Sequence, residues 1–424
     1  MRRILTVTGF SAMLTVLRML LAIIIAKAIA VYTGPTGLAM LGQFQNVITS
    51  LNGLVNASSS NGVIKFTAEY SAEGIINCTP WWKASVKWSL GIFFLIFSLL
   101  LFFAGDFSYW LFNDLSYSWL IIITGCSLPF VTIGTLITSI LNGRQQYREY
   151  IKAGVLSTLI TATIMIYMIV AHGLKGALIA AAIQNAIVGA VILVFCFKQS
   201  WFKFGNFFGR VEIKHILGLG GFILMAVTSA LTVPISFIFV RNIIIENAGW
   251  GSAGEWQAVW RISETYLAVI TIALSSYYLP RLSELKLPAE IQSEMLFTLK
   301  FVVPFSILAA LGIFVFRDFI IAILFTPEFR AARDLFLLQL CGDVIKVVSW
   351  VVAYPMISGG KIKLYVFSEI FFSLTFVLLT SFFVEKMGVQ GANLAFLVNY
   401  LIYLIVMLYL FFYSKGFLSK ANYG

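Results

Sequence analysis

The chain has 424 residues, of which 60% are hydrophobic and 11% are charged, and its mean hydropathy is +0.95. A soluble protein of this length needs more charge to cover its surface, so these values exclude a soluble fold. The formal net charge of +11 does not indicate nucleic-acid binding, because the basic residues lie in short segments between apolar runs rather than in blocks. The composition therefore predicts an all-α polytopic membrane protein.

Long apolar runs follow one another along the whole chain. The first run begins after Arg3 and continues past Val31 without a small-residue cleavage site, which indicates an uncleaved helix rather than a signal peptide. A span needs about 20 apolar residues at a rise of about 1.5 Å per residue. We expect about twelve transmembrane helices, at 9–31, 38–70, 84–104, 118–141, 151–171, 176–198, 215–245, 253–282, 295–316, 332–359, 363–384 and 390–413.

Lysine and arginine are distributed unevenly over the loops that these spans define. With a cytoplasmic N-terminus, the cytoplasmic segments hold 18 of the 29 Lys and Arg residues, the periplasmic segments hold five and the helices hold six. Cytoplasmic loops of membrane proteins carry an excess of such residues. We therefore expect both termini of this multi-pass chain to lie in the cytoplasm.

The second half of the sequence resembles the first half at a nearly constant offset. Four short segments of the first half match segments of the second half: 34–37 with 251–254, 64–66 with 280–282, 142–143 with 358–359, and 173–180 with 388–395. Glycines recur at helix starts by chance, but four matches at nearly one offset favour a duplication. Six helices separate the copies, so we expect parallel six-helix bundles, 1–212 and 213–424, with the substrate between them.

Ionisable side chains inside the predicted spans are the main candidates for function, because each costs about 2.5–3.5 kcal/mol at the bilayer centre. Lys27, Arg241 and Glu255 lie near periplasmic ends, where we expect them to reach the interface. Lys65 and Glu69 are four residues apart, so we expect them to pair. The other residues of this kind are Arg18, Arg261, Glu264, Asp343, Lys346 and Glu369.

Polar residues form continuous stripes on several of these helices. Arg261 and Glu264 share a face of the span 253–282 with neutral polar residues, and Gln339, Asp343 and Lys346 form a similar stripe in 332–359. A third stripe, on 38–70, includes Asn46 and Asn56.

Two interpretations of the stripes remain open. In the first, Arg261 pairs with Glu264 and Asp343 pairs with Lys346, and the charges serve only structure. In the second, a water-filled cavity presents basic residues to an anionic ligand and acids to coupling ions, which the rows of neutral polar residues favour. The four cysteines are widely spaced and form no CxxC motif, so we expect no metal site and no cofactor.

Three groups of segments carry a resemblance to a known family. They are Gly34-Pro-Thr-Gly-Leu38 with Asn61-Gly-Val-Ile-Lys65; Trp256-Gln-Ala-Val-Trp-Arg-Ile-Ser-Glu-Thr-Tyr-Leu267 with Tyr278-Leu-Pro-Arg-Leu-Ser283; and Arg333-Asp-Leu-Phe336 with Gln339-Leu-Cys-Gly-Asp-Val-Ile-Lys346 and Glu369. In these segments the chain resembles the O-antigen flippase (Wzx) family, and within it the enterobacterial common antigen branch. That family belongs to the multidrug/oligosaccharidyl-lipid/polysaccharide (MOP) exporter superfamily.

The resemblance implies a fold, a location and a substrate. The fold is two six-helix bundles around a central cleft, and the location is the bacterial inner membrane. The substrate is an undecaprenyl-pyrophosphate-linked oligosaccharide, an O-antigen unit or a common-antigen lipid of the lipid III type, moved from the cytoplasmic to the periplasmic leaflet. Membrane lipid, a glycan polymerase and a chain-length regulator are the implied partners, and no catalytic site is expected.

The resemblance also implies roles for individual residues. The implied substrate-binding residues of the central cavity are Arg18, Asn46, Asn56, Lys65, Arg261 and Lys346. The implied candidates for coupling to H⁺ or Na⁺ are Asp343, Glu264 and Glu369.

Other functions fit the sequence less well. A drug or cation exporter of the same superfamily needs acids in its lumen and has little need for deep arginines such as Arg18 and Arg261. A membrane polymerase acting on the lipid-linked glycan needs a sizeable periplasmic loop, whereas the longest one expected here covers only positions 317–331.

We predict that reporters fused at Lys203 and Lys286 report the cytoplasm and that reporters fused at Asp114 and Glu328 report the periplasm. Paired alkaline phosphatase and fluorescent-protein fusions at each position measure this directly. Opposite labelling at any two of the four positions would overturn the assignment of helices.

Overall fold

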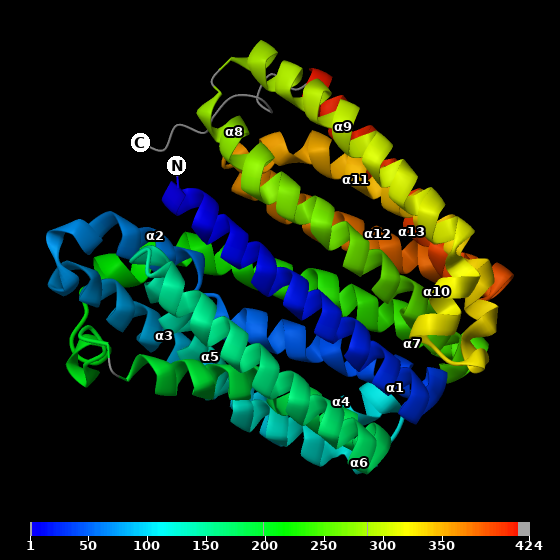
Figure 1. Ribbon diagram of the computed structural model, residues 1–424, viewed down its shortest axis with the longest axis horizontal. Coiled ribbons are helices and arrows are strands. Elements are labelled where there is room, and N and C mark those ends of the chain that lie inside the picture. Colours follow the sequence, from blue (N-terminus) through cyan, green and yellow to red (C-terminus); the bar gives the residue numbers. More distant parts are fainter. Residues whose placement is uncertain (1, 198, 286, 414–424) are drawn as a thin grey trace. The chain divides into compact units, whose positions relative to one another are not determined.

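The computed structural model describes the backbone of residues 2–197, 199–285 and 287–413, and the side chains of the same ranges except 2–16, 72 and 147. The predicted fusion site Lys286 and the chain ends, Met1 and 414–424, lie outside the described residues. Within those ranges the secondary structure is helical (Figure 1).

The helices follow one another with short connections. In chain order they are α1 (Arg2–Asn56), α2 (Asn61–Tyr70), α3 (Ile75–Phe102), α4 (Ala104–Phe112), α5 (Ser118–Gly143), α6 (Tyr147–Cys196), α7 (Ile213–Ala273), α8 (Leu279–Glu284), α9 (Pro288–Val315), α10 (Arg317–Leu324), α11 (Phe336–Ser358), α12 (Ile362–Met387) and α13 (Val389–Tyr413). A π-helix, η4 (Leu274–Tyr278), joins α7 to α8, and short 3₁₀ turns include η3 (Phe204–Asn206) and η5 (Pro327–Leu335).

Nine helical stretches of the described chain are long and apolar enough to cross a membrane. Three of them are far longer than the roughly 20 residues that one crossing needs: Leu17–Tyr70, Arg148–Cys196 and Ile213–Glu284. The fold class expected from the sequence, an all-α polytopic membrane protein, is therefore confirmed.

A glycine with non-helical backbone angles divides each of the three long stretches. Gly34 (φ 63°, ψ −169°), Gly173 (φ 55°, ψ −133°) and Gly249 (φ 82°, ψ 169°) each join two helical segments. A positive φ crowds the Cβ of an L-residue, so glycine is the residue that allows the chain to turn there. The three glycines lie in connections that the sequence predicts, between 31 and 38, 171 and 176, and 245 and 253.

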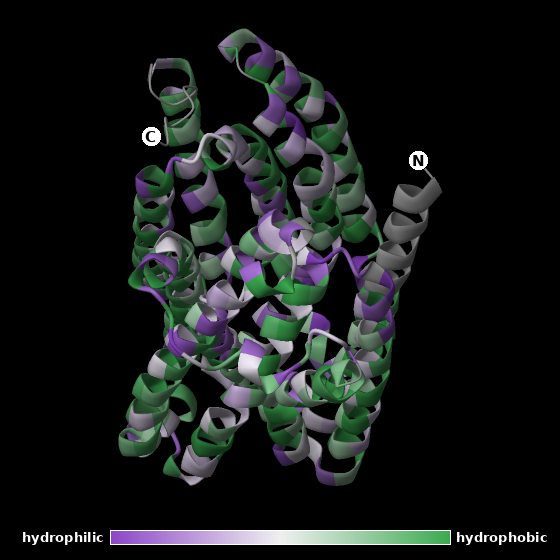
Figure 2. Cartoon of the chain, turned by 90° about the vertical axis from the view of Figure 1, so that its left-hand side faces the viewer, coloured by the Kyte–Doolittle hydropathy of each residue, from purple (hydrophilic) through white to green (hydrophobic). Residues whose placement is uncertain are grey.

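Apolar side chains on the outer faces of the helices agree with a lipid environment. Phe102 is 84% exposed and Leu378 is 71% exposed, and large apolar residues are exposed along most helices. Figure 2 shows that most helical turns are hydrophobic in colour. Contiguous exposed apolar surface of this kind is rare on soluble monomers, so lipid is the medium that covers it.

The chain folds into two compact units. The first comprises the chain up to Thr33 and Met40–Ile235, and the second comprises Gly34–Ala39 and the chain from Ser236 onward. Helices α1 and α7 thus contribute to both units.

Each unit has its own packed core. In the first unit, Trp82, Ile140 and Trp201 are buried in a cluster formed by α2, α3, α5, α6 and the segment after α6. In the second unit, Tyr278 and Val351 belong to a cluster formed by the end of α7, η4, α8, α9, α11, α12 and α13. Within this unit α13 packs on α11 and α12 (Figure 1).

Small residues permit the close approach of α5 and α6 in the first unit. A Cβ on Gly134 would lie 2.5 Å from Cα of Gly189, and a Cβ on Gly189 would overlap the Phe130 carbonyl. Glycine pairs of this kind let membrane helices pack backbone against backbone, which supplies van der Waals contact where lipid offers no hydrophobic driving force.

We predict that Gly189→Val lowers the melting temperature of the detergent-solubilised protein, because overpacking a close interface costs about 1–3 kcal/mol. Gly91→Val in α3 is the matched control, since a Cβ there meets nothing within 4 Å. Fluorescence-detected size-exclusion chromatography after heating measures both variants. Equal melting temperatures for the two would contradict the close packing of α5 on α6.

Candidate functional site

A buried carboxyl group, Asp343 of α11, lies inside the second unit with no exposed surface. Its Oδ2 accepts hydrogen bonds from the hydroxyls of Ser263 (2.5 Å) and Tyr266 (3.0 Å), both on α7. Its Oδ1 accepts one from Nε2 of Gln339 (3.1 Å), one turn earlier on α11. Three neutral donors therefore hold a carboxylate that joins α7 to α11, and none of them cancels its charge.

Lys346 lies one turn beyond Asp343 and is half-buried. Among the described residues it forms no salt bridge within 4.0 Å, although it interacts electrostatically with Asp343, so the structure does not favour the interpretation in which these two residues form a local ion pair. Its Nζ lies between 4.9 and 5.4 Å from the centroids of four aromatic rings, those of Trp260, Trp350, Phe396 and Tyr400. Ring faces attract a cation through their quadrupole, and the attraction grows when water is removed.

Glu264 is the acid that faces the basic residues of this unit. It is exposed, and it interacts electrostatically with Arg241, Arg261 and Lys346. Arg261, three residues before it on α7, is half-buried. The residues of the two stripes, Arg261 and Glu264 on α7 and Asp343 and Lys346 on α11, thus all lie in the second unit.

Arg241 is a member of this cluster that the sequence analysis assigned wrongly. We expected it to reach the membrane interface, but it is 1% exposed, because the second unit encloses it. It donates a hydrogen bond to Oε1 of Gln257, beyond the turn at Gly249, and its guanidinium lies 5.6 Å from the centroid of the Trp256 ring. The sequence indicated only that Arg241 is an isolated arginine in the apolar run 215–245. Its partners become visible only in the folded structure.

Glu369 of α12 belongs to the aromatic side of the same unit. It is half-buried and accepts a hydrogen bond from Tyr365, one turn earlier. It also interacts electrostatically with Tyr400, one of the rings around Lys346, and with Tyr403. All three expected coupling residues therefore lie in the second unit.

The expected binding residues of the first unit have separate surroundings. Arg18 is exposed, donates from Nε to Oγ1 of Thr158 (3.4 Å), and lines a small cavity of about 150 Å³ with Tyr150 and Ser157. Asn46 and Asn56 of α1 are half-buried. Oδ1 of Asn56 is buried without a hydrogen-bond partner among the described residues.

Lys65 of α2 does not pair with Glu69. Both side chains are exposed, and the salt bridges of the described chain do not include them. The Lys65 ammonium instead lies 5.3 Å from the Phe66 ring centroid and 5.6 Å from that of Phe222. The four-residue spacing predicted a pair, but the aromatic rings of α2 and α7 offer the cation a more apolar contact.

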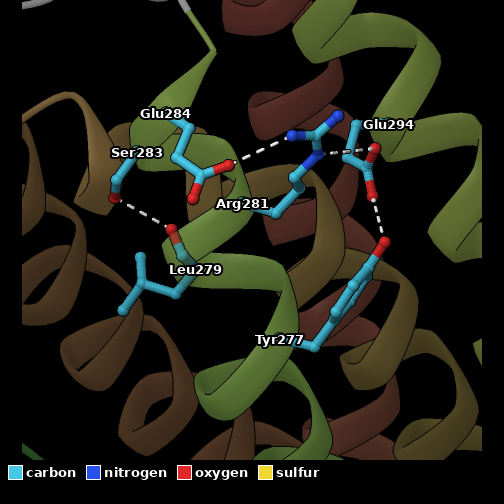
Figure 3. A network of polar contacts seen from close by, with 6 residues as sticks. All are labelled: Tyr277, Leu279, Arg281, Ser283, Glu284 and Glu294. Atoms are coloured by element: carbon cyan, nitrogen blue, oxygen red, sulfur yellow. Dashed lines mark hydrogen bonds and ion pairs between the residues drawn. The ribbon is translucent and has the colours of Figure 1, made fainter. Parts of the chain in front are cut away.

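A second polar network, missed by the sequence analysis, surrounds Arg281 after the π-helix η4 (Figure 3). Arg281 forms salt bridges with Glu284 (3.1 Å) and with Glu294 of α9 (3.7 Å), and the Tyr277 hydroxyl donates to Glu294 (3.2 Å). Tyr277, Arg281 and Glu294 line an open hollow of about 550 Å³. Single-turn π-helices often occur at functional sites.

Solved structures show which fold the chain has. The chain superposes on an inward-facing MATE family multidrug resistance transporter of the MOP superfamily with a TM-score of 0.77, at 16% identity, over 92% of this chain and 96% of that one. It superposes on the lipid II flippase MurJ in an inward closed conformation with a TM-score of 0.71, at 16% identity, over 96% and 87%. The chain therefore has a MATE- and MurJ-like fold.

Sequence comparison identifies the relatives more closely. No family model matches the chain. The lipid III flippases of Escherichia coli (strain K12) and Shigella flexneri are each 28% identical to it over 405 residues, which cover 93% of this chain and 94% of each relative. The chain is therefore a homologue of the lipid III flippases, and the resemblance found in its sequence is confirmed.

Proposed function

We propose that the chain is a flippase that moves an undecaprenyl-pyrophosphate-linked oligosaccharide from the cytoplasmic to the periplasmic leaflet of the bacterial inner membrane. The observation that carries the proposal is the likeness to the lipid III flippases over 93% of the chain. The substrate is an O-antigen unit or a lipid of the lipid III type. A glycan polymerase and a chain-length regulator are the partners that would receive the translocated unit.

The chain crosses the membrane twelve times in this proposal, with both ends cytoplasmic. Nine stretches of the described chain are long enough to cross, and the turns at Gly34, Gly173 and Gly249 divide three of them, which supports twelve crossings. Short connections then join all spans, which leaves the loops too small for a catalytic domain.

The backbone supports two parallel repeats, 1–212 and 213–424. Gly173 (φ 55°, ψ −133°) and Gly388 (φ 58°, ψ −145°) have nearly the same conformation and occupy corresponding positions of the two repeats. Gly34 and Gly249, which have the same separation in the sequence, form a second matching pair. The conformation thus pairs Gly34 with Gly249, two positions before the Gly251 that the sequence alignment paired with it. Parallel repeats of this kind alternate access by moving against each other.

The basic residues of the second unit are suited to an anionic lipid headgroup. Arg241, Arg261 and Lys346 are three basic groups of this unit, with Glu264, Asp343 and Glu369 as the acids near them. Arg261 can form paired hydrogen bonds with a pyrophosphate, as guanidinium groups do. Arg18, Lys65, Asn46 and Asn56 are the candidates of the first unit for contacts with the sugars and the pyrophosphate.

Asp343 is the candidate through which an ion would act on conformation. In the ionised state its oxygens accept from Ser263, Tyr266 and Gln339. A proton would turn one oxygen into a donor, so at least one of these hydroxyls or the amide would have to reorient. A ligand shifts a conformational equilibrium only through different affinity for its two states, and this rearrangement between α7 and α11 would supply the difference. Glu264 and Glu369 are the alternative coupling residues.

A multidrug or cation exporter is the competing function, and one assay separates the two. Proteoliposomes that contain the purified wild type and an undecaprenyl-pyrophosphate-linked glycan should show protein-dependent flipping. Efflux of cationic dyes without flipping of the glycolipid would favour the exporter.

We predict that Arg261→Ala slows glycolipid flipping about tenfold or more. Losing a charged hydrogen bond costs about 1.5–3 kcal/mol, and about 1.4 kcal/mol corresponds to tenfold. Arg330→Ala, which removes an exposed arginine of the same unit, is the control and should flip normally. Full recovery of flipping in the double variant Arg261→Ala with Glu264→Ala would show that Arg261 only balances Glu264 and does not bind the ligand.

We predict that a pH or sodium gradient accelerates flipping by the wild type but not by Asp343→Asn. The amide keeps the shape and part of the hydrogen bonding of the carboxyl group but cannot change its charge. Glu246→Gln, at an exposed position of α7, is the control and should keep the response. Equal acceleration of both proteins would remove Asp343 from the coupling mechanism, and acceleration of neither would argue against coupling itself.

A further inference from the structure

An apolar cavity of about 600 Å³ lies in the first unit, among α3, α5, the end of α6 with Phe197, and the segment 199–208. Ligand pockets typically enclose about 300–1,000 Å³. Its walls include Leu90 and Phe93 of α3, Ile133 of α5, Leu193 of α6, and Phe202 and Phe208 of the segment. A concave surface of this size differs from the convex helix faces that ordinarily meet lipid.

The lining accepts only an apolar occupant. Its two hydroxyl groups are both already engaged: Ser89 bonds with Ser58 and Ser59, and Thr132 donates to the Leu128 carbonyl. Among the described residues, no charged side chain lines the cavity. A sugar or a polar drug would lose its hydrogen bonds to water there without replacement, whereas a hydrocarbon chain would lose none.

The segment after α6 is a fixed wall of this cavity. Trp201 is buried, its ring lies edge-on to Trp82 at 5.9 Å, and its Nε1 donates to Oε1 of Gln146 (3.2 Å). Asn206 donates from Nδ2 to the Trp201 carbonyl (2.8 Å), which closes the turn between them. Phe207 stacks on Trp82 with centroids 5.9 Å apart. Trp201 and Phe207 are therefore held against α3, whereas Phe204 and Phe208, which also line the cavity, are exposed.

Basic residues flank the cavity. Lys87 lies on α3 between lining residues, Lys203 lies in the segment between Phe202 and Phe204, and Arg210 follows two positions after Phe208. Lys83 approaches the segment too, because its Nζ lies 3.4 Å from the position of a Cβ on Gly209.

Acidic residues do not neutralise this basic group. The sequence ranges 74–105 and 150–211 contain no Asp or Glu, and no salt bridge in the described chain involves the four basic side chains. The next acid, Glu212, is bonded to Lys214 at 2.7 Å, and that hydrogen bond lowers the pKa of Glu212. An apolar cavity beside unbalanced positive charge is complementary to a lipid with an anionic headgroup.

We propose that this cavity holds the isoprenyl units next to the pyrophosphate of the incoming lipid-linked glycan, while Lys83, Lys87, Lys203 and Arg210 contact the pyrophosphate. The inference rests on the proposed function, because it names where the lipid portion of that substrate binds. The basic loops place the cavity on the cytoplasmic side, where the substrate is loaded. A pyrophosphate diester carries one more negative charge than the phosphodiester of a phospholipid, so the unbalanced cations favour it.

Photo-cross-linking tests the occupant. A benzophenone amino acid replaces Leu90, which lines the cavity and is 43% exposed, or Leu95, which is 64% exposed on the same helix and does not line it. Each variant is reconstituted in phosphatidylethanolamine and phosphatidylglycerol with undecaprenyl pyrophosphate, irradiated, and analysed by mass spectrometry. We expect undecaprenyl pyrophosphate adducts several-fold more abundant at position 90 than at position 95. Adducts with phospholipid only, or equal isoprenyl adducts at both positions, would overturn the proposal.

The basic residues beside the cavity provide a second, independent test. Lys203→Gln with Arg210→Gln should lower the isoprenyl adduct at position 90 several-fold, whereas Lys152→Gln, at a lysine paired with Glu149, should not. An unchanged abundance of the isoprenyl adduct in the double variant would overturn the proposed contact of Lys203 and Arg210 with the pyrophosphate.

A substitution that fills the cavity tests whether the site contributes to transport. Leu90→Trp should raise the glycolipid concentration needed for half-maximal flipping, and Leu95→Trp should not. Equal flipping by both variants would contradict the proposal. A wild type that forms the isoprenyl adduct at position 90 but does not flip glycolipid would overturn the proposed function while supporting the cavity.

Discussion

The cost of placing charge inside a hydrocarbon layer is the constraint on which this structure depends. Each ionised side chain in a span must be paired, enclosed with hydrogen-bonding groups, or led to the interface. The second unit uses enclosure. The charged groups of α7 and α11 have different kinds of neighbour. Hydroxyls and an amide surround Asp343, and aromatic rings surround Lys346. Gln257 and the Trp256 ring lie beside Arg241. Most of these close neighbours are neutral, so hydrogen bonds and ring faces, rather than direct ion pairs, stabilise Asp343 and Lys346.

Because Asp343 and Lys346 have different neighbours, the carboxyl group can respond to an ion separately from the binding of an anion by the ammonium group. A salt bridge between Asp343 and Lys346 would fix both side chains and make each insensitive to ions or substrate. With the carboxyl group held by neutral donors, a change in its protonation alters the hydrogen bonds between α7 and α11 and the field at Lys346 together. The four aromatic rings around Lys346 contact its ammonium without donating to or accepting from Asp343. The arrangement therefore suits a transporter that must respond to an ion while it retains a site for an anion.

Hydropathy predicted the helices and the connections at Gly34, Gly173 and Gly249, because the length of an apolar run depends on the local chain and on the membrane. The stripe on α11 likewise identified Asp343 and Lys346, since helical periodicity places residues on a common face. Periodicity does not specify which helix lies opposite that face. For this reason the sequence left a pair of Asp343 with Lys346 open as one interpretation, paired Lys65 with Glu69, and placed Arg241 at the interface. The partners that replaced those expectations, such as Tyr266, Trp260 and Gln257, lie on other helices or beyond a turn.

The proposed substrate has a polar glycan, a charged pyrophosphate and a long hydrocarbon chain, and each part requires different surroundings. The polar and charged residues of the second unit can exchange hydrogen bonds with sugars or phosphate, whereas the described lining of the cavity beside Leu90 has no free polar group to offer. A lipid tail drawn into a polar cavity would expose hydrocarbon to water, and a glycan drawn through lipid would lose its hydrogen bonds. Transport of the whole molecule is therefore least costly when the headgroup follows the polar residues and the tail stays in an apolar phase. On this argument the aromatic segment near Trp201 would keep the hydrocarbon chain apart from the glycan headgroup while the lipid is loaded.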